Sequence, residues 1–426
     1  MNYTDKFLFE KEEKWRGFEK AAGKKMADAL REWYELYTED AVDWFAELYE
    51  PRVGGWYYSK SARDNETVEY REKTYKLLPD VESTNQALNF LQSAGLVDDF
   101  GGRYSAALPE WMKKDIVNFV YNLQDEDGFY YHPQWGKEIP VTRRGRDLSW
   151  SRSILRNMGV TPRYASTVDK TSDEKKAPAI PEHLASEESF RKYLEPLDLA
   201  GRSYGVGNLL ISQAEQIKAA GRMDQLIKHL NERQRSDTGY WHATPGYTAV
   251  NGLLKISSVY NVAEVPFPNA MAAARSAIEA ISSPEEFLIV CDIYNTWFTV
   301  DNIASNLRKY GGEEGERQAK KLISDLRDVA AEGMRCSARK LKRFKKADGS
   351  FSFLRDYSSE ISQSMPVALY HTVEGDVNAT LIATSGTVEK CLCAIGMPEY
   401  MPPIFGRPHF ERFMEIIEEN RRKAGN

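Results

Sequence analysis

The chain has 426 residues, a net charge of −6, 42% hydrophobic residues and 28% charged residues. This length and composition fit a soluble globular protein with a substantial core, in one large domain or two to three smaller ones. The acidic balance argues against nucleic acid as a partner, and more mildly against any large polyanion unless a local basic cleft overrides it.

No apolar run reaches the roughly 18 residues that a bilayer-spanning helix requires, so we expect no membrane partner. The charged residues that follow Met1 differ from the apolar core of a signal peptide. We therefore expect a cytoplasmic protein, and the sequence leaves its oligomeric state open.

Apolar residues recur at three- to four-residue spacing along most of the chain, which predicts amphipathic helices. In residues 7–50 this spacing is kept by Trp15, Phe18, Ala22, Met26, Leu30 and Trp33. Further helices are expected over residues 84–94, 109–123, 148–158, 213–234, 247–259, 284–307, 315–344, 376–395 and 410–422. No convincing run of alternating strand residues appears. The predicted fold class is all-α, built from helical hairpins with short extended turns.

A polar stretch interrupts the helical pattern near the middle of the chain. Residues 163–190 contain Pro178 and Pro181 and few apolar residues. This composition predicts a long exposed loop or a lid, after which helices resume near Ser189.

The cysteines, Cys291, Cys336, Cys391 and Cys393, suggest no disulfide framework. Cys391 and Cys393 lie two apart on an expected helix, so their side chains point about 200° apart, which suits a shared metal poorly. We expect buried free thiols, no metal site and no cofactor.

Four glycine turns share a pattern of a polar residue, a short turn, glycine and aromatic residues. The clearest copies run from Gln124 through Gly128 and from Gln234 through Gly239, and looser copies surround Gly54 and Gly349. Glycine tolerates the positive φ of a tight turn. The aromatic residue is expected to fold back over the helix ends, and the glutamine amide to bond helix-terminal carbonyls. Repetition predicts units that each bury a face against their neighbours.

These turns resemble the glutamine–tryptophan repeats of the terpenoid cyclase and protein prenyltransferase superfamily, with Gln234, Gly239 and Trp241 matching best. The resemblance implies an α/α toroid, with inner and outer rings of helices around a central cavity, formed by residues 1–426 as one domain. Polysaccharide lyases share this fold and many glycosidases resemble it, so the fold leaves the function open.

The acid and metal motifs of that superfamily are incomplete in this chain. The segment nearest to an aspartate-rich cyclase motif begins at Asp376, but Asn378 and Ala379 replace its later carboxylates. No DDxxD diphosphate motif is present, and Cys291-Asp292 has the wrong order and spacing for a prenyltransferase zinc site. Asp376 remains the candidate acid for a cyclase-like reaction.

Polar and aromatic side chains gather in and after the two clearest turns. We predict His242, Tyr247, Asn251 and His132 as proton-transfer and orienting groups, because His and Tyr act as acids and bases. Arg143 and Arg146 are predicted carboxylate binders, since Arg pairs with carboxylates in a bidentate fork. Trp135, Trp241 and Tyr131 are predicted to stack on sugar rings.

These residues favour a carbohydrate-active enzyme, a lyase or a glycoside hydrolase, acting on an oligosaccharide; a uronate-containing chain is one candidate substrate. One alternative is a terpenoid cyclase-like enzyme or isoprenoid binder, which requires an apolar cavity around Asp376. The other is a non-catalytic helical scaffold, in which the cavity is filled. Structural roles compete with these assignments, because Asp127 and Asp348 precede glycines as turn formers do and Trp241 suits packing.

Overall fold

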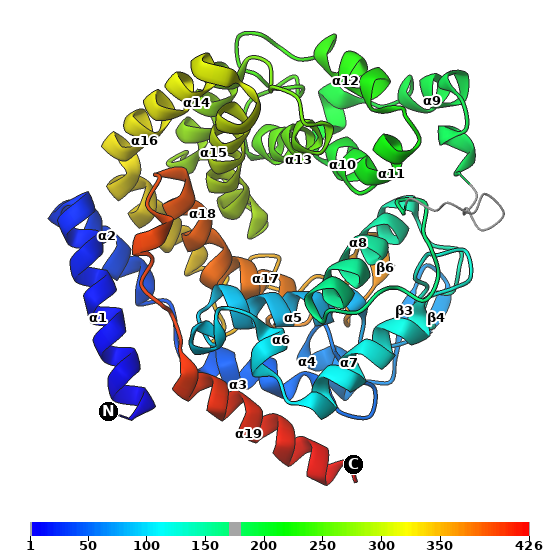
Figure 1. Cartoon of the computed structure of the whole chain (residues 1–426), viewed down its shortest axis with the longest axis vertical. Helices are drawn as coiled ribbons and strands as arrows, with labels where there is room; N and C mark the ends of the chain where they lie inside the picture. Colours follow the sequence, from blue (N-terminus) through cyan, green and yellow to red (C-terminus); the bar gives the residue numbers. More distant parts are fainter. Residues whose placement is uncertain (1, 170–179, 426) are drawn as a thin grey trace.

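The computed structural model describes residues 2–169 and 180–425, which fold mostly into α-helices with short antiparallel hairpins (Figure 1). The predicted all-α class is confirmed. No helix in the described residues is both long enough and apolar enough to cross a bilayer. Of the predicted loop over residues 163–190, residues 170–179 lie outside the described part of the chain.

One set of helices forms a continuous series of packing contacts. It comprises α5 (Val81–Ser93), α8 (Val141–Asn157), α10 (Leu199–Ile211), α13 (Tyr247–Ala263), α15 (Cys291–Tyr310), α17 (Val377–Leu381) and α18 (Thr387–Ala394). Each packs against the next, from α5 through α8, α10, α13 and α15 to α18, and α17 packs back against α5. A π-helical turn, Ile382–Gly386, connects α17 to α18. We refer to this set as the central helices.

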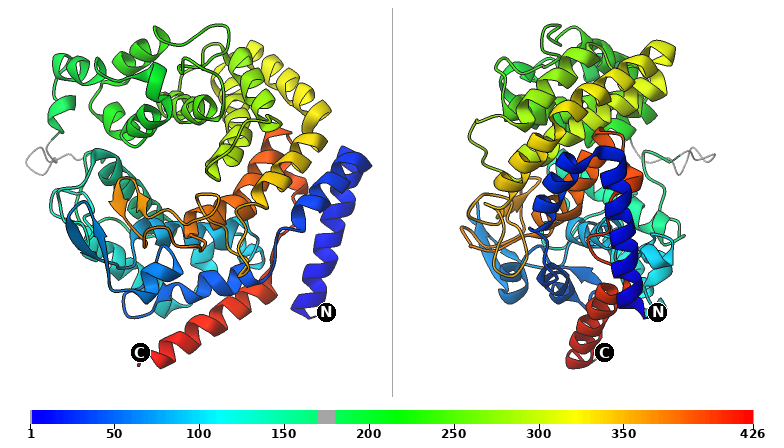
Figure 2. Two further views of the ribbon diagram at one scale, coloured as in Figure 1. Left: turned by 180° about the vertical axis from the view of Figure 1, so that it is seen from behind. Right: turned by 90° about the vertical axis from the view of Figure 1, so that its left-hand side faces the viewer.

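The remaining elements lie mainly outside the central helices (Figures 1 and 2). The helices are α1 (Tyr3–Ala22), α2 (Lys24–Tyr34), α3 (Asp40–Glu47), α4 (Lys60–Asp64), α6 (Tyr104–Ala107), α7 (Glu110–Leu123), α9 (Glu187–Leu194), α11 (Ala214–Ala219), α12 (Met223–Asn231), α14 (Ala270–Ile281), α16 (Gly312–Leu341) and α19 (Arg407–Lys423). The hairpins pair β1 (Tyr49–Glu50) with β2 (Gly55–Trp56), β3 (Thr67–Tyr70) with β4 (Lys73–Lys76), and β5 (Ile361–Ser362) with β6 (Met365–Pro366).

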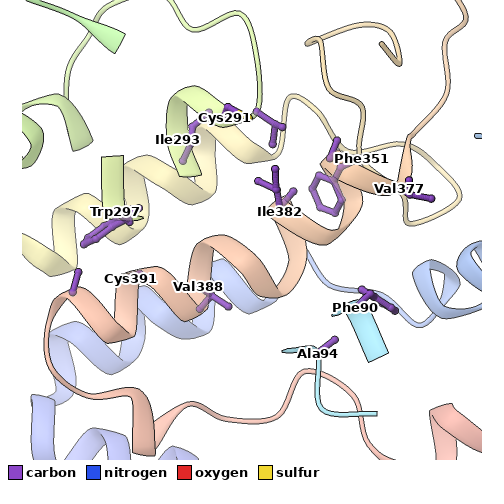
Figure 3. Close-up of a cluster of buried hydrophobic side chains, with 14 of the residues drawn as sticks. Phe90, Ala94, Cys291, Ile293, Trp297, Phe351, Val377, Ile382, Val388 and Cys391 are labelled. Carbon is purple, nitrogen blue, oxygen red and sulfur yellow. The ribbon is translucent and has the colours of Figure 1, made fainter. Parts of the chain in front are cut away.

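A large hydrophobic core joins the central and outer helices. It extends from Trp15 in α1 to Ile417 in α19. Figure 3 shows the part where α15, α17 and α18 meet, with Trp297, Ile382 and Val388 among the labelled side chains. The central helices are therefore held from outside by packing, which leaves their other faces available for polar residues.

The four glycine turns adopt equivalent conformations, as the repeat predicts. Gly54, Gly128, Gly239 and Gly349 have φ of 84°, 83°, 71° and 77°. Each turn follows an outer helix (α3, α7, α12 or α16) and leads towards a central helix (α5, α8, α13 or α17). Each also touches another segment: a Cβ on Gly239 would lie 2.4 Å from Cβ of Ala273 in α14. Both conformation and space therefore require glycine.

The polar and aromatic residues of the turns tie the helix ends together. Nε2 of Gln234 donates to the carbonyl oxygens of Gly239 and Pro268 at 2.9 and 3.1 Å. Trp56 and Trp241 each donate their indole N–H to the carbonyl of the residue eleven positions earlier, Phe45 at 3.0 Å and Leu230 at 2.9 Å. The expected folding back of the aromatic residue over the preceding helix is confirmed at both turns.

We predict that Gly239→Ala destabilises the protein by roughly 2–4 kcal/mol, because it combines an unfavourable positive φ with overpacking against α14. Gly221 is the matched control: its φ is 69°, and no atom lies within 4 Å of an added Cβ. Gly221→Ala should therefore carry the conformational penalty alone. Chemical denaturation of both variants checks the difference, and equal losses would contradict the close approach.

Candidate functional site

A cavity of about 650 Å³ lies among the central helices. Its wall includes residues from α5, α8, α10, α13, α15, α17 and α18, together with Ser362 and Gln363 of the β5–β6 hairpin. The cavity is therefore assembled from segments spread over more than 300 residues, between Tyr58 and Lys390. Its lining is mixed, with amides, charged groups and aromatic rings side by side.

Helix α5 contributes a polar stripe to this wall. Glu82, Gln86, Asn89 and Ser93 all line the cavity, and their spacing places them on one helical face. They span about 16 Å of helix length. Gln86 donates to Oδ1 of Asn378 at 3.2 Å, which joins the stripe to the start of α17.

Two cationic side chains face the cavity from α8 and α13. Arg146 donates from Nη2 to Oδ1 of Asn208 at 3.3 Å, but its buried Nε has no hydrogen-bond partner in the described residues. The Lys255 ammonium makes no hydrogen bond or ion pair with any residue that the structure describes. Burial, and then the charge of Arg146, lower the pKa of Lys255 to about 8. Such groups suit an anionic ligand, because desolvated charges are stable only when paired.

Tyr204 and Cys291 lie near these cations on the cavity wall. Burial raises the pKa of the Cys291 thiol to about 11, and it also raises the pKa of the Tyr204 hydroxyl. Both groups therefore stay protonated at neutral pH. The cavity therefore contains a proton donor, Tyr204, together with Lys255, which can lose its proton near pH 8.

A buried ion cluster supports the cavity from behind. Arg143 is 0% exposed and donates from Nη1 to Glu82 at 2.9 Å and from Nε to Asp147 at 3.0 Å. Its Nη2 lies 3.4 Å from Oδ1 of Asp80, which caps α5. Burial raises the pKa of Asp147 to about 7. Glu82 also accepts from the Ser362 hydroxyl at 2.5 Å, so this cavity carboxylate already has partners.

Of the residues predicted to form the site, Arg146 lines the cavity directly. Arg143 lies one helical turn away in the ion cluster. Asn251 is one layer behind the wall: it donates to Asp292 at 2.8 Å and accepts from Asn295 at 2.9 Å. Asn295 lines the cavity, and its own Oδ1 is buried without a partner in the described residues.

The predicted residues in the turn after α7 are held by local contacts and are not among those that line the cavity. Nε2 of His132 donates to the Pro79 carbonyl at 2.7 Å, and the Trp135 indole donates to the Pro366 carbonyl at 3.1 Å. Tyr131 donates its hydroxyl to Asp127 at 2.8 Å.

The predicted residues around the turn before α13 are also absent from the lining. Trp241 is bonded to Leu230, and the His242 ring bonds within its own turn to Thr244 at 2.9 Å. The Tyr247 hydroxyl accepts from Lys340. The structure therefore does not bring these side chains together with those of the other turn around the cavity.

Asp376 caps α17 and is fully buried. Its carboxylate accepts from the backbone N–H of Ala379 at 2.8 Å and of Phe353 at 2.7 Å. Burial raises its pKa to about 7. Tyr58 and Phe353 line the cavity beside it, whereas Asp376 is not among the lining residues.

Lys255, Tyr204 and the α5 stripe were not predicted from the sequence. Their signal in the sequence is a polar residue repeated at four-residue spacing on an otherwise apolar helix, as in Tyr204 with Asn208 and Asn251 with Lys255. Comparisons with protein-family models and with curated proteins find no match for this chain. Among the described residues, no group of three or more His, Cys, Asp or Glu side chains is arranged to hold a metal ion.

We predict that His132 makes stability depend on pH. Burial lowers the pKa of its ring from an ordinary 6.5 to about 4, so the folded state favours the neutral form. The neutral ring therefore contributes to the free energy of unfolding fully above pH 6.5, and this contribution is lost as the pH falls towards 4. Between pH 7 and 5 the loss is about 2 kcal/mol. The difference in unfolding free energy between wild type and His132→Asn should therefore be smaller at pH 5 than at pH 7 by that amount.

The exposed His371 provides the control for this experiment. A His371→Asn variant should track the wild type at both pH values. A constant gap between wild type and His132→Asn would contradict the buried, neutral state of His132.

Proposed function

We propose that the chain is an α/α toroid whose inner ring consists of the central helices, with an architecture like that of the terpenoid cyclase and prenyltransferase superfamily. The support is twofold. The contacts of the central helices lead from α5 around to α17 and back to α5. Each of the four glycine turns follows an outer helix and precedes the segment that leads to an inner helix.

For its activity, we propose a carbohydrate-active enzyme that binds an oligosaccharide containing uronate in the cavity. The observation that carries this proposal is the pair of incompletely neutralised cations, Arg146 and Lys255, in a cavity otherwise rich in amides and aromatic rings. A uronate offers a carboxylate for Arg146, hydroxyls for the amides, and an apolar ring face for Trp150 or Phe298.

The reaction that these groups favour is β-elimination. Arg146 would pair with the uronate carboxylate and stabilise the charge that develops when the proton on C5 leaves. Neutral Lys255 would accept that proton, the C5–H electron pair would form the C4=C5 bond, and the C4–O4 bond would break. The Tyr204 hydroxyl would protonate the departing O4, and a solvent-mediated transfer from the Lys255 ammonium would restore the phenol.

Hydrolysis is the alternative within the same substrate class, and it calls for two available carboxylates. Glu82 and Glu389 both line the cavity. Glu82 is engaged by Arg143 and Ser362, and Glu389 lies 3.5 Å from the ammonium of Lys390. Burial raises the pKa of Glu82, but its carboxylate is occupied by Arg143 and Ser362, so the cavity does not offer a free carboxylate pair. Elimination therefore fits the cavity better.

The two other predicted functions have weaker support. A cyclase-like enzyme would use Asp376, whose raised pKa suits an acid. However, Asp376 is engaged as a helix cap, and the cavity contains Arg146, Lys255 and Lys390 where an isoprenoid needs apolar walls. A scaffold would need no open cavity of 650 Å³.

We predict that oligogalacturonate binds and that the corresponding neutral galactose oligomer binds at least tenfold more weakly, because a charge-assisted hydrogen bond contributes about 1.5–3 kcal/mol. Arg146→Met should remove this preference. Lys255→Met should weaken binding less than Arg146→Met does but abolish formation of the unsaturated product, measured by its ultraviolet absorbance. In the wild type, the elimination rate should rise as the pH increases through about 8, where Lys255 loses its proton.

Arg275, an exposed residue of α14, gives a charge-matched control. Arg275→Met should leave binding and turnover unchanged. Equal affinity for charged and neutral oligomers would refute the uronate assignment. Binding of a neutral prenol in preference to both would favour the isoprenoid alternative.

A further inference from the structure

A second hollow adjoins the cavity at one edge. This groove of about 440 Å³ lies between the beginning of α8 and the length of α10, and Thr142, Asp198, Arg202 and Gly205 are among its lining residues. Asn208 and Gln363 line both the groove and the cavity. The two hollows therefore meet at these side chains, close to Arg146, which bonds Asn208.

The backbone keeps the groove open. Helix α10 is kinked at Arg202, which has a non-helical φ of −136° and ψ of 34°. Three residues later, Gly205 has no side chain, and a Cβ there would meet no atom within 4 Å. Just past the end of α10 the chain closes on α8: a Cβ on Gly145 of α8 would lie 2.2 Å from the Ser212 carbonyl oxygen. The groove thus ends where α10 ends.

The third wall of the groove is the tip of the β5–β6 hairpin. Gln363 and Ser364 have positive φ of 49° and 69°, a conformation that favours glycine or asparagine. The hairpin is fixed on both sides, by Ser362 on Glu82 and by Gln134 and Trp135 on the Pro366 carbonyl. Backbone strain held in place by surrounding contacts is typical of functional positions.

The groove carries its own cation. Arg202 is exposed, and its guanidinium has no hydrogen-bond or ion-pair partner in residues 2–169 and 180–425. The nearby Asp198 is occupied as the cap of α10, where it accepts from the Gly201 N–H at 2.8 Å. Arg202 and Asn208 are separated by about 9 Å along the helix. That distance is longer than one pyranose ring.

We infer that the binding site continues from the cavity through this groove, so that the ligand is an acidic chain of several sugar units. The inference rests on the proposed function and specifies its substrate class. One uronate occupies the cavity at Arg146, and the chain leaves past Asn208 and Gln363. A further carboxylate then reaches Arg202. A single acidic sugar fills only part of this site.

Calorimetric titration with mono-, di- and tetragalacturonate tests the inference. Affinity should increase with chain length in the wild type. Arg202→Ala should weaken the tetramer about fivefold, as expected for an exposed ion pair, and leave the monomer unchanged. Gly205→Leu should fill the groove and weaken the tetramer at least tenfold, again without affecting the monomer.

Leucine at position 205 is compatible with folding because the site is helical and open, and circular dichroism with a melting curve verifies this. Arg275→Ala serves as the control for the removed charge. If the monomer and tetramer bind equally and both groove variants behave as wild type, the extension is refuted while the proposed function stands. If the wild type binds no galacturonate of any length, the proposed function fails and the extension fails with it.

Discussion

The buried ion cluster around Arg143 holds together segments that are far apart in the sequence. Its guanidinium pairs with Asp80 and Glu82 at the start of α5 and with Asp147 on its own helix α8. Glu82 in turn holds the β5–β6 hairpin through Ser362. Removing one partner from such a cluster typically costs about 3–5 kcal/mol, because the other charges stay buried. The cluster therefore fixes α5, α8 and the hairpin at the edge of the cavity.

A second constraint keeps α13 and α15 in register. Asn251 bonds Asp292 and Asn295, and two turns further along Asn302 donates to Ser257 at 2.8 Å, while Asn306 donates to Asn261 at 2.7 Å. Buried amides need partners, so sliding one helix along the other would break several bonds together. This ladder explains the burial of Asn251, and it fixes the face of α13 that carries Lys255 and the face of α15 that carries Asn295.

The turns were predictable from sequence because their determinants are local. Gly239 and Trp241 act within one hairpin, and the conformation of the one and the bond of the other follow from a few neighbouring residues. The site was much less predictable. His132 was predicted as a proton-transfer and orienting group, yet its buried ring bonds the Pro79 carbonyl and packs beside Trp135. The four-residue spacing of Lys255 from Asn251 does not reveal its role, since that role depends on Arg146, more than 100 residues away.

The charge of the cavity is opposite in sign to that of the whole protein. The net charge is −6, yet Arg146 and Lys255 face a partly enclosed space without full neutralisation. Holding desolvated cations in this way opposes folding, and apolar residues of similar size would be more stable there. Under the proposed function, a bound carboxylate neutralises these cations. Their unfavourable free energy in the ligand-free protein therefore strengthens the binding of an anion. The Arg143 cluster and the amide ladder make the cost tolerable, because they fix the helices that carry the two cations.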